Sequence, residues 1–120
     1  MKFMLAAYEA DEDILNRRGD GTDRDGEYWQ RWKTFGRAMA RAGVIREMHG
    51  LRENEAACTL RLRAGRPEVE PGAAFNAFHL GGYFIIDVAD AEAAVEWAAQ
   101  CPAATLGIVE IRPLLVVPDA

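Results

Sequence analysis

Two histidines are the residues of this sequence best suited to move a proton near neutral pH. His49 and His79 titrate there without help from their surroundings, and a neighbouring carboxylate could orient either ring. A histidine beside an acid can remove a proton from a phenol or a carbon acid. We predict His49, His79 and Asp87 as catalytic candidates, with Asp87 or Glu47 orienting the histidine. For each histidine alone, an exposed or hydrogen-bonded side chain without a catalytic role stays open as the alternative.

Strand alternation brings further polar side chains onto one face, because successive residues of a strand point to opposite sides of the sheet. In the last predicted strand, Val109 and Ile111 should face the helices, so Glu110 and Arg112 face away. By the same rule residues 83, 85 and 87 share one side, as do residues 45, 47 and 49. The residues that we expect to contact substrate are Tyr8, Glu47, Tyr83, Glu110 and Arg112. For Glu110 and Arg112, an ion network that closes a dimer is the preferred alternative.

No metal site and no cofactor are predicted. The acids Asp11, Glu12 and Asp13 are consecutive, so their side chains diverge, and a solvated loop is the preferred interpretation. Cys58 and Cys101 are 43 positions apart, a spacing typical of neither a disulfide scaffold nor a metal framework. Cys101 is expected at a helix C-terminus, where the dipole disfavours a thiolate nucleophile. No phosphate loop, Gly-x-Ser-x-Gly turn or dinucleotide fingerprint occurs.

Hydrophobic periodicity predicts the elements that must position these residues. Strands are expected at 2–8, 44–51, 82–88 and 107–117, and a hairpin with a solvated outer side at 58–70. A helix should begin near Asp25 as N-cap and end at Gly43, and a second should follow the cap Asp90 over 91–100. The predicted buried helix faces are Tyr28, Trp32, Phe35 and Met39 in the first, and Ala91, Ala94, Val95 and Ala98 in the second.

This order predicts a single α+β domain over 1–120, a ferredoxin-like β-α-β-β-α-β arrangement with an inserted β-hairpin. Two helices would cover one face of the sheet. The predicted strands are apolar on both faces, and 120 residues provide no second layer. We therefore expect a homodimer in which two sheets pack face to face as a dimeric α/β barrel.

Charge is concentrated in one early segment. The net charge of the chain is −5, and residues 9–27 hold eight acids and three bases, which alone give 3 − 8 = −5. This pattern argues against a nucleic-acid-binding protein. No apolar run reaches the roughly 20 residues of a membrane span, and no signal peptide is recognised, so we expect a cytoplasmic protein without a membrane partner. We predict that the segment is mostly loop and forms a mobile flap or a helix-bearing loop that makes a pocket entrance negative and disfavours anionic ligands.

Several stretches resemble the YCII-related family, including its branch named for an Asp-Gly-Pro-Phe motif. The similar stretches are MKFMLAAYEADE, RAGVIREMHGL, TLRLRAGRPEVEPGAAF, LGGYFIIDVADAEAAVEWAAQCPAA and VEIRPLL. The resemblance extends from Met1 to about Val116. It implies a bacterial, cytoplasmic dimeric α/β barrel of ferredoxin-like subunits. In some members a His and Asp pair is thought to act on small molecules, and members of the named branch often accompany extracytoplasmic-function sigma factors.

The chain departs from that branch at its namesake motif. The motif aligns with Pro71, Gly72, Ala73 or Ala74, and Phe75, so its Asp and Pro are missing. His49 stands where the family usually has an acid. Two functions follow as expectations: a cofactor-independent enzyme that binds a small organic molecule in a barrel pocket and uses His as general acid or base, or a non-catalytic ligand-binding or regulatory module associated with a sigma factor.

Overall fold

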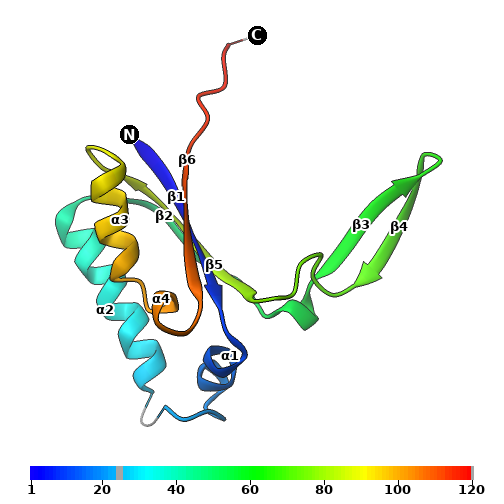
Figure 1. The fold of residues 1–120 in the computed structure, drawn as a ribbon, viewed down its shortest axis with the longest axis horizontal. Helices are drawn as coiled ribbons and strands as arrows, with labels where there is room; N and C mark the ends of the chain where they lie inside the picture. Colours follow the sequence, from blue (N-terminus) through cyan, green and yellow to red (C-terminus); the bar gives the residue numbers. More distant parts are fainter. Residues whose placement is uncertain (24–25, 120) are drawn as a thin grey trace.

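An antiparallel sheet of four strands forms the centre of the molecule (Figure 1). The computed structural model describes residues 1–23 and 26–119. The strands are β1 (Lys2–Glu9), β2 (Ile45–Gly50), β5 (His79–Asp87) and β6 (Ile108–Pro113), in the spatial order β2-β5-β1-β6. The predicted α+β class is confirmed, and the strand order is compatible with a ferredoxin-like fold.

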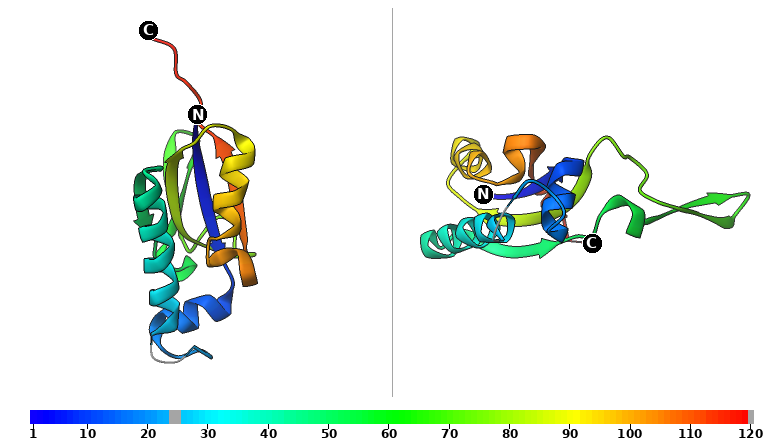
Figure 2. Two further views of the ribbon diagram at one scale, coloured as in Figure 1. Left: turned by 90° about the vertical axis from the view of Figure 1, so that its left-hand side faces the viewer. Right: turned by 90° about the horizontal axis from the view of Figure 1, so that it is seen from below.

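Helices α2 (Glu27–Ala42) and α3 (Ala91–Ala99) cover one face of this sheet (Figure 2). Their apolar side chains pack on Phe3, Leu5 and Ile86, which alternate toward the helices. In α2, Tyr28, Phe35 and Met39 are buried and Trp32 is partly buried, which confirms the predicted face. Gly43 ends this helix at a φ of 71°, a left-handed conformation that glycine adopts without steric cost. The predicted N-cap Asp25 lies outside the described residues.

The face of α3 is predicted only in part. Asp90 caps the helix as expected, since its carboxylate accepts a hydrogen bond from the amide of Ala93 at 2.9 Å. Ala94 and Ala98 are buried, whereas Ala91 and Val95 are exposed. Ala93 and Trp97 pack against the core instead, so the contact stripe is rotated by about one residue.

The acidic segment contains a helix where mostly loop was predicted. Helix α1 (Asp11–Arg18) follows β1 after one residue, with three acids in its first turn and two arginines in its last. That charge order suits the helix dipole. The Asp13 carboxylate accepts the amide hydrogen of Ala10 at 3.0 Å, half of a capping box. Of the two alternatives for this segment, the helix-bearing one is therefore confirmed.

A hairpin of β3 (Cys58–Arg63) and β4 (Arg66–Pro71) extends away from the sheet (Figure 1). The short helix η1 (Asn54–Ala56) precedes it. Leu60 pairs with Val69, and Leu62 with Pro67, so one face of the hairpin is apolar yet exposed. The predicted hairpin is confirmed. Within the described residues, none of the helices and none of the four strands of the main sheet cover it, so it remains largely exposed.

Two features of the C-terminal part of the chain differ from the sequence-based prediction. The short helix α4 (Ala103–Leu106) follows α3 and was not predicted. The last strand ends at Pro113 rather than at residue 117, because its partner β1 begins at Lys2, whose carbonyl accepts a last hydrogen bond from the amide of Leu114 at 2.9 Å. Residues Leu115, Val116 and Val117 are consequently exposed.

The face of the sheet opposite the helices is uncovered in the described residues. The molecule measures 49 × 47 × 17 Å, so it is a thin two-layer structure with projections. The single chain forms an open sheet with β2 and β6 as its edges, not a closed barrel. Within the described part of the chain, none of the helices is both long and apolar enough to cross a membrane.

Candidate functional site

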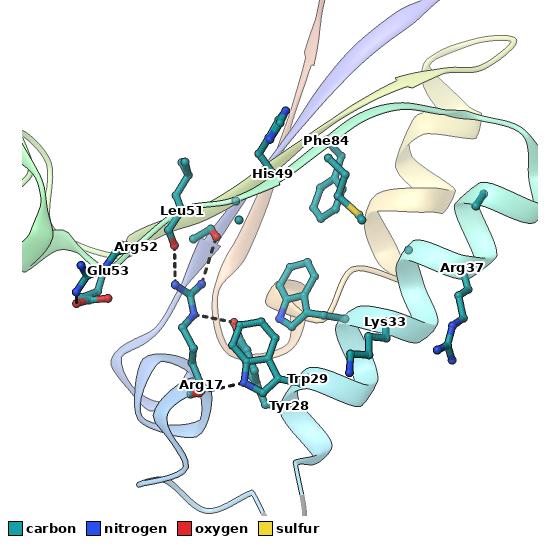
Figure 3. Close-up of a pocket in the computed structure, with 17 residues that line it drawn as sticks. Arg17, Tyr28, Trp29, Lys33, Arg37, His49, Leu51, Arg52, Glu53 and Phe84 are labelled. Atoms are coloured by element: carbon teal, nitrogen blue, oxygen red, sulfur yellow. Dashed lines mark hydrogen bonds and ion pairs between the residues drawn. The ribbon is translucent and has the colours of Figure 1, made fainter.

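A groove of about 740 Å³ lies between α2 and the edge strand β2 (Figure 3). Helix α2 contributes aromatic side chains from its first two turns, and the segment 48–53 forms the opposite wall. Phe84 of the central strand β5 lies at the base, where its ring stacks on Trp32 with the centroids 5.7 Å apart. The aromatic residues lining the groove are Tyr28, Trp29, Trp32 and Phe84. Volume and lining are typical of a small-molecule site.

A buried ion pair closes one end of the groove. The Nη2 group of Arg17 donates to the Glu9 carboxylate at 2.5 Å, and its Nη1 group donates to the Leu51 carbonyl at 2.6 Å. The Tyr28 hydroxyl donates to the other Glu9 oxygen at 2.6 Å. Burial raises the pKa of Glu9, although the bonds from Tyr28 and Arg17 oppose that shift. Burial and the carboxylate also raise the pKa of Tyr28, so this phenol remains a neutral donor.

Two glycines of β5 make this cluster possible. A side chain at Gly81 would overlap the Glu9 carboxylate and the Arg17 guanidinium. A Cβ at Gly82 would lie 2.9 Å from the carbonyl oxygen of His49 on the neighbouring strand. Because neither glycine has a side chain, Glu9, Arg17 and β2 can lie close to the backbone of β5.

The charge on the groove is positive, opposite to the entrance that we predicted. Four basic residues line it, namely Arg17, Lys33, Arg37 and Arg52, against the single carboxylate Glu53. The acidic segment contributes one lining residue, Arg17, which is a base. Glu53 lies 3.3 Å from both Arg18 and Arg52, and Glu9 pairs with Arg17. Within the described residues, Lys33 and Arg37 have no carboxylate within 4.0 Å.

His49 lies on the uncovered face of the sheet, and in Figure 3 its ring points away from Arg17 and Trp29. Its Nε2 atom is 3.6 Å from Glu47, and its ring lies 5.3 Å from that of Tyr83. The structure thus brings three predicted site residues together on the uncovered face. Ile45 does not share their side, because an extra residue at Arg46 shifts the register and turns Ile45 toward the core.

His79 lies apart from His49, buried at the start of β5. The Asn54 amide donates to its Nδ1 atom at 3.0 Å, and its Nε2 atom lies 2.7 Å from a carboxylate oxygen of Asp11. Both ring nitrogens are therefore engaged. Strand β5 carries one unpaired residue, Gly81, between the partners of Ala7 and Tyr8, and this bulge turns His79 toward the helix side.

The remaining predicted residues share the uncovered face but form separate groups. Arg112 donates to Glu110 at 2.7 Å, two positions apart on β6. Asp87 lies at the far end of β5, 3.2 Å from the N-terminal ammonium and 3.7 Å from Arg46. That ammonium holds the pKa of Asp87 below its usual value. Tyr8 is half-buried on the same face and contacts the register partners Leu80 and Ile108.

The sequence analysis did not predict the groove. It placed Tyr28 and Trp32 on a buried helix face, and none of Trp29, Lys33 and Arg37 is among the predicted site residues. The available signal was the spacing: Trp29, Lys33 and Arg37 follow one another at four-residue intervals, which places aromatic and basic groups on one helix face.

The described residues hold no cluster of three His, Cys, Asp or Glu side chains suited to a metal ion. The acids at 11–13 make contacts within the protein. Asp13 caps helix α1, Asp11 contacts His79, and Glu12 accepts the amide hydrogen of Thr22.

Comparison with known proteins identifies the family of the chain. A search of the curated proteins finds no match. The family model described as the YCII-related domain matches residues 1–117, nearly the whole chain. The chain therefore belongs to the YCII-related family.

Proposed function

We propose that the protein binds a small organic molecule in the groove between α2 and β2. The observation that carries this proposal is the lining: four aromatic side chains and two cations that have no carboxylate partner among the described residues line a space of about 740 Å³. An apolar cleft with a few polar groups that converge on it is the usual form of a ligand site. Arg17 fixes the position of its wall, because its guanidinium bonds to the carbonyls of Leu51 and Gly81.

Amide chemical shifts in the presence of a library of small aromatic fragments test this proposal. We expect the shifts caused by binding to cluster at 29–36, 48–53 and 81–84. Ala40→Phe should abolish them, since Ala40 lines the groove and is exposed, so that a larger side chain fills the space without a core clash. Thr34→Phe is the matched control, because Thr34 is exposed on the same helix but outside the groove. Shifts confined to the uncovered face of the sheet would contradict the proposal.

We also propose that the protein acts as a homodimer whose uncovered sheet faces pack together. Three features support a second copy as the cover. The uncovered face carries apolar side chains such as Ile85 and Ile108 beside charged groups of both signs, such as the Glu110–Arg112 pair. Such a face can pack against a second copy of itself. The apolar face of the hairpin is exposed. The radius of gyration is 16.3 Å, against about 14 Å for an average domain of this length.

A second candidate function is catalysis inside that dimer, with His49 as the catalytic residue. Its ring is more than half exposed, lies tilted at 38° to the ring of Tyr83 and is beside Glu47, which could orient it as a general base. Small carbon acids in D₂O test it: wild type should exchange the acidic C–H for deuterium faster than buffer does, and His49→Gln should not. His79→Gln is the comparison, because both nitrogens of His79 are occupied. Exchange in wild type no faster than in buffer would exclude this function.

A further inference from the structure

We propose that the ligand of the groove is a planar aromatic anion, with its ring against the tryptophans of α2 and its negative group between Lys33 and Arg37. This inference rests on the proposed function of the groove and names the chemical class that it selects. Two features of the lining support it: a pair of cations without a carboxylate partner among the described residues, and an aromatic wall formed by Trp29, Trp32 and Phe84.

The cations are the first feature. Lys33 and Arg37 lie one turn apart on α2 and both line the groove. Like charges at this spacing repel and destabilise a helix. The other two bases of the groove are compensated, because Glu9 pairs with Arg17 and Glu53 with Arg52. A single anionic group beside Lys33 and Arg37 would relieve their repulsion, and the described residues supply no such group.

The aromatic wall is the second feature. Trp29, Trp32 and Phe84 line the groove, and the rings of Trp32 and Phe84 stack with their centroids 5.7 Å apart. A planar ring can pack against such a wall, because aromatic rings attract one another beyond the area that they bury. A carboxylate or phenolate on that ring supplies the negative charge that Lys33 and Arg37 require.

The dimensions and the charge of the protein define the size of this ligand. A space of about 740 Å³ lies within the range of single small-molecule sites, roughly 300–1,000 Å³. Of the bases that line the groove, Lys33 and Arg37 are the two without a carboxylate partner among the described residues, while the whole chain has a net charge of −5. A nucleic acid would be repelled by that net charge, whereas one compact anion can bind between two adjacent cations.

Three probes of the same shape and different charge separate the possibilities: 2-naphthoate, 2-naphthylmethanol and 2-naphthylmethylammonium. Their dissociation constants are measured by calorimetry on the full chain at low and high salt. We expect 2-naphthoate to bind at least tenfold more tightly than the alcohol, with an advantage that shrinks as salt is added. The ammonium probe should bind most weakly, although aromatic faces alone would favour it.

The variants identify the groups responsible. Lys33→Gln with Arg37→Gln should bring the affinity for 2-naphthoate to that for the alcohol and leave the alcohol's unchanged within about twofold. Arg41→Gln is the matched control, because Arg41 continues the same row of bases outside the groove. Trp29→Leu removes an exposed ring from the wall of the groove and should weaken the binding of both 2-naphthoate and the alcohol severalfold.

Each outcome separates the inference from the function on which it rests. Equal affinity of wild type for naphthoate and alcohol, or a naphthoate preference that survives in the double variant, would overturn the anion assignment and leave a groove that binds neutral aromatics. Failure of all three probes to bind would overturn both proposals.

Discussion

At the scale of single residues, the surroundings of a side chain decide its chemistry more than its type does. The two histidines show this. His49 lies exposed beside Glu47 and Tyr83, whereas His79 has both nitrogens engaged by Asn54 and Asp11. The sequence could identify both as candidates for proton transfer. It could not separate them, because the bulge at Gly81 that turns His79 inward arises from the pairing of β1 with β5.

The two cysteines give the sharpest prediction at this scale. Cys58 is exposed, whereas Cys101 is 2% exposed and burial raises the pKa of its thiol to about 12. At pH 8 a thiol of that pKa is a thiolate in on the order of one molecule in ten thousand. We expect a disulfide reagent to label one thiol per chain rapidly and the second only after unfolding in guanidinium.

Cys58→Ser is the control for that assignment. The variant should show no rapid labelling, and denaturation should then release one thiol. Two equally fast thiols in the native protein would show that Cys101 is accessible.

At the scale of elements, the helices and strands with a strong hydrophobic periodicity were the ones predicted correctly. The strands at 2–8 and 58–63 and the buried face of α2 were predicted closely, since their apolar residues repeat at the period of the element. The bounds of helix α1 were not predicted, because its stability comes from its neighbours: Arg17 bonds to Glu9 and to the carbonyls of Leu51 and Gly81. The two bulges likewise depend on pairing between strands distant in the sequence.

The Glu9–Arg17 pair should therefore act as the joint between α1 and the sheet. Glu9→Gln leaves the Arg17 guanidinium largely buried without a counter-charge, which costs about 3–5 kcal/mol of the free energy of unfolding. Arg17→Met should be similarly destabilising, since it leaves the Glu9 carboxylate unpaired. The double variant should lose clearly less than the sum, because neither unpaired charge remains. Urea unfolding at one fixed protein concentration measures all three.

Tyr28→Phe supplies a milder test of the same cluster. It removes the hydrogen bond that the hydroxyl donates to Glu9 and the longer one that it accepts from Nε of Arg17, and should cost about 1–2 kcal/mol. Losses in the Glu9 and Arg17 variants that simply add would contradict a coupled pair.

At the scale of the whole molecule, the unusual property is how much apolar surface is exposed. The hairpin, the segment after Pro113 and one face of the sheet are uncovered in the described residues. The sequence predicted a sheet with apolar residues on both faces and so anticipated this property. It did not predict the groove, which is created where α2, β2 and the turn after β2 meet.

A second copy on the uncovered sheet face would bury these residues, and one substitution tests it. Ile85 lies half-buried on that face, opposite Met4 and Glu47 in the register. We expect light scattering to give twice 13.3 kDa for wild type and 13.3 kDa for Ile85→Lys, because a lysine at a packed sheet interface must bury its charge. Val95→Lys, on the exposed side of α3, introduces the same charge and should remain dimeric. If Val95→Lys dissociated the protein and Ile85→Lys did not, the interface would lie on the helical layer, and the barrel that encloses His49 would not form.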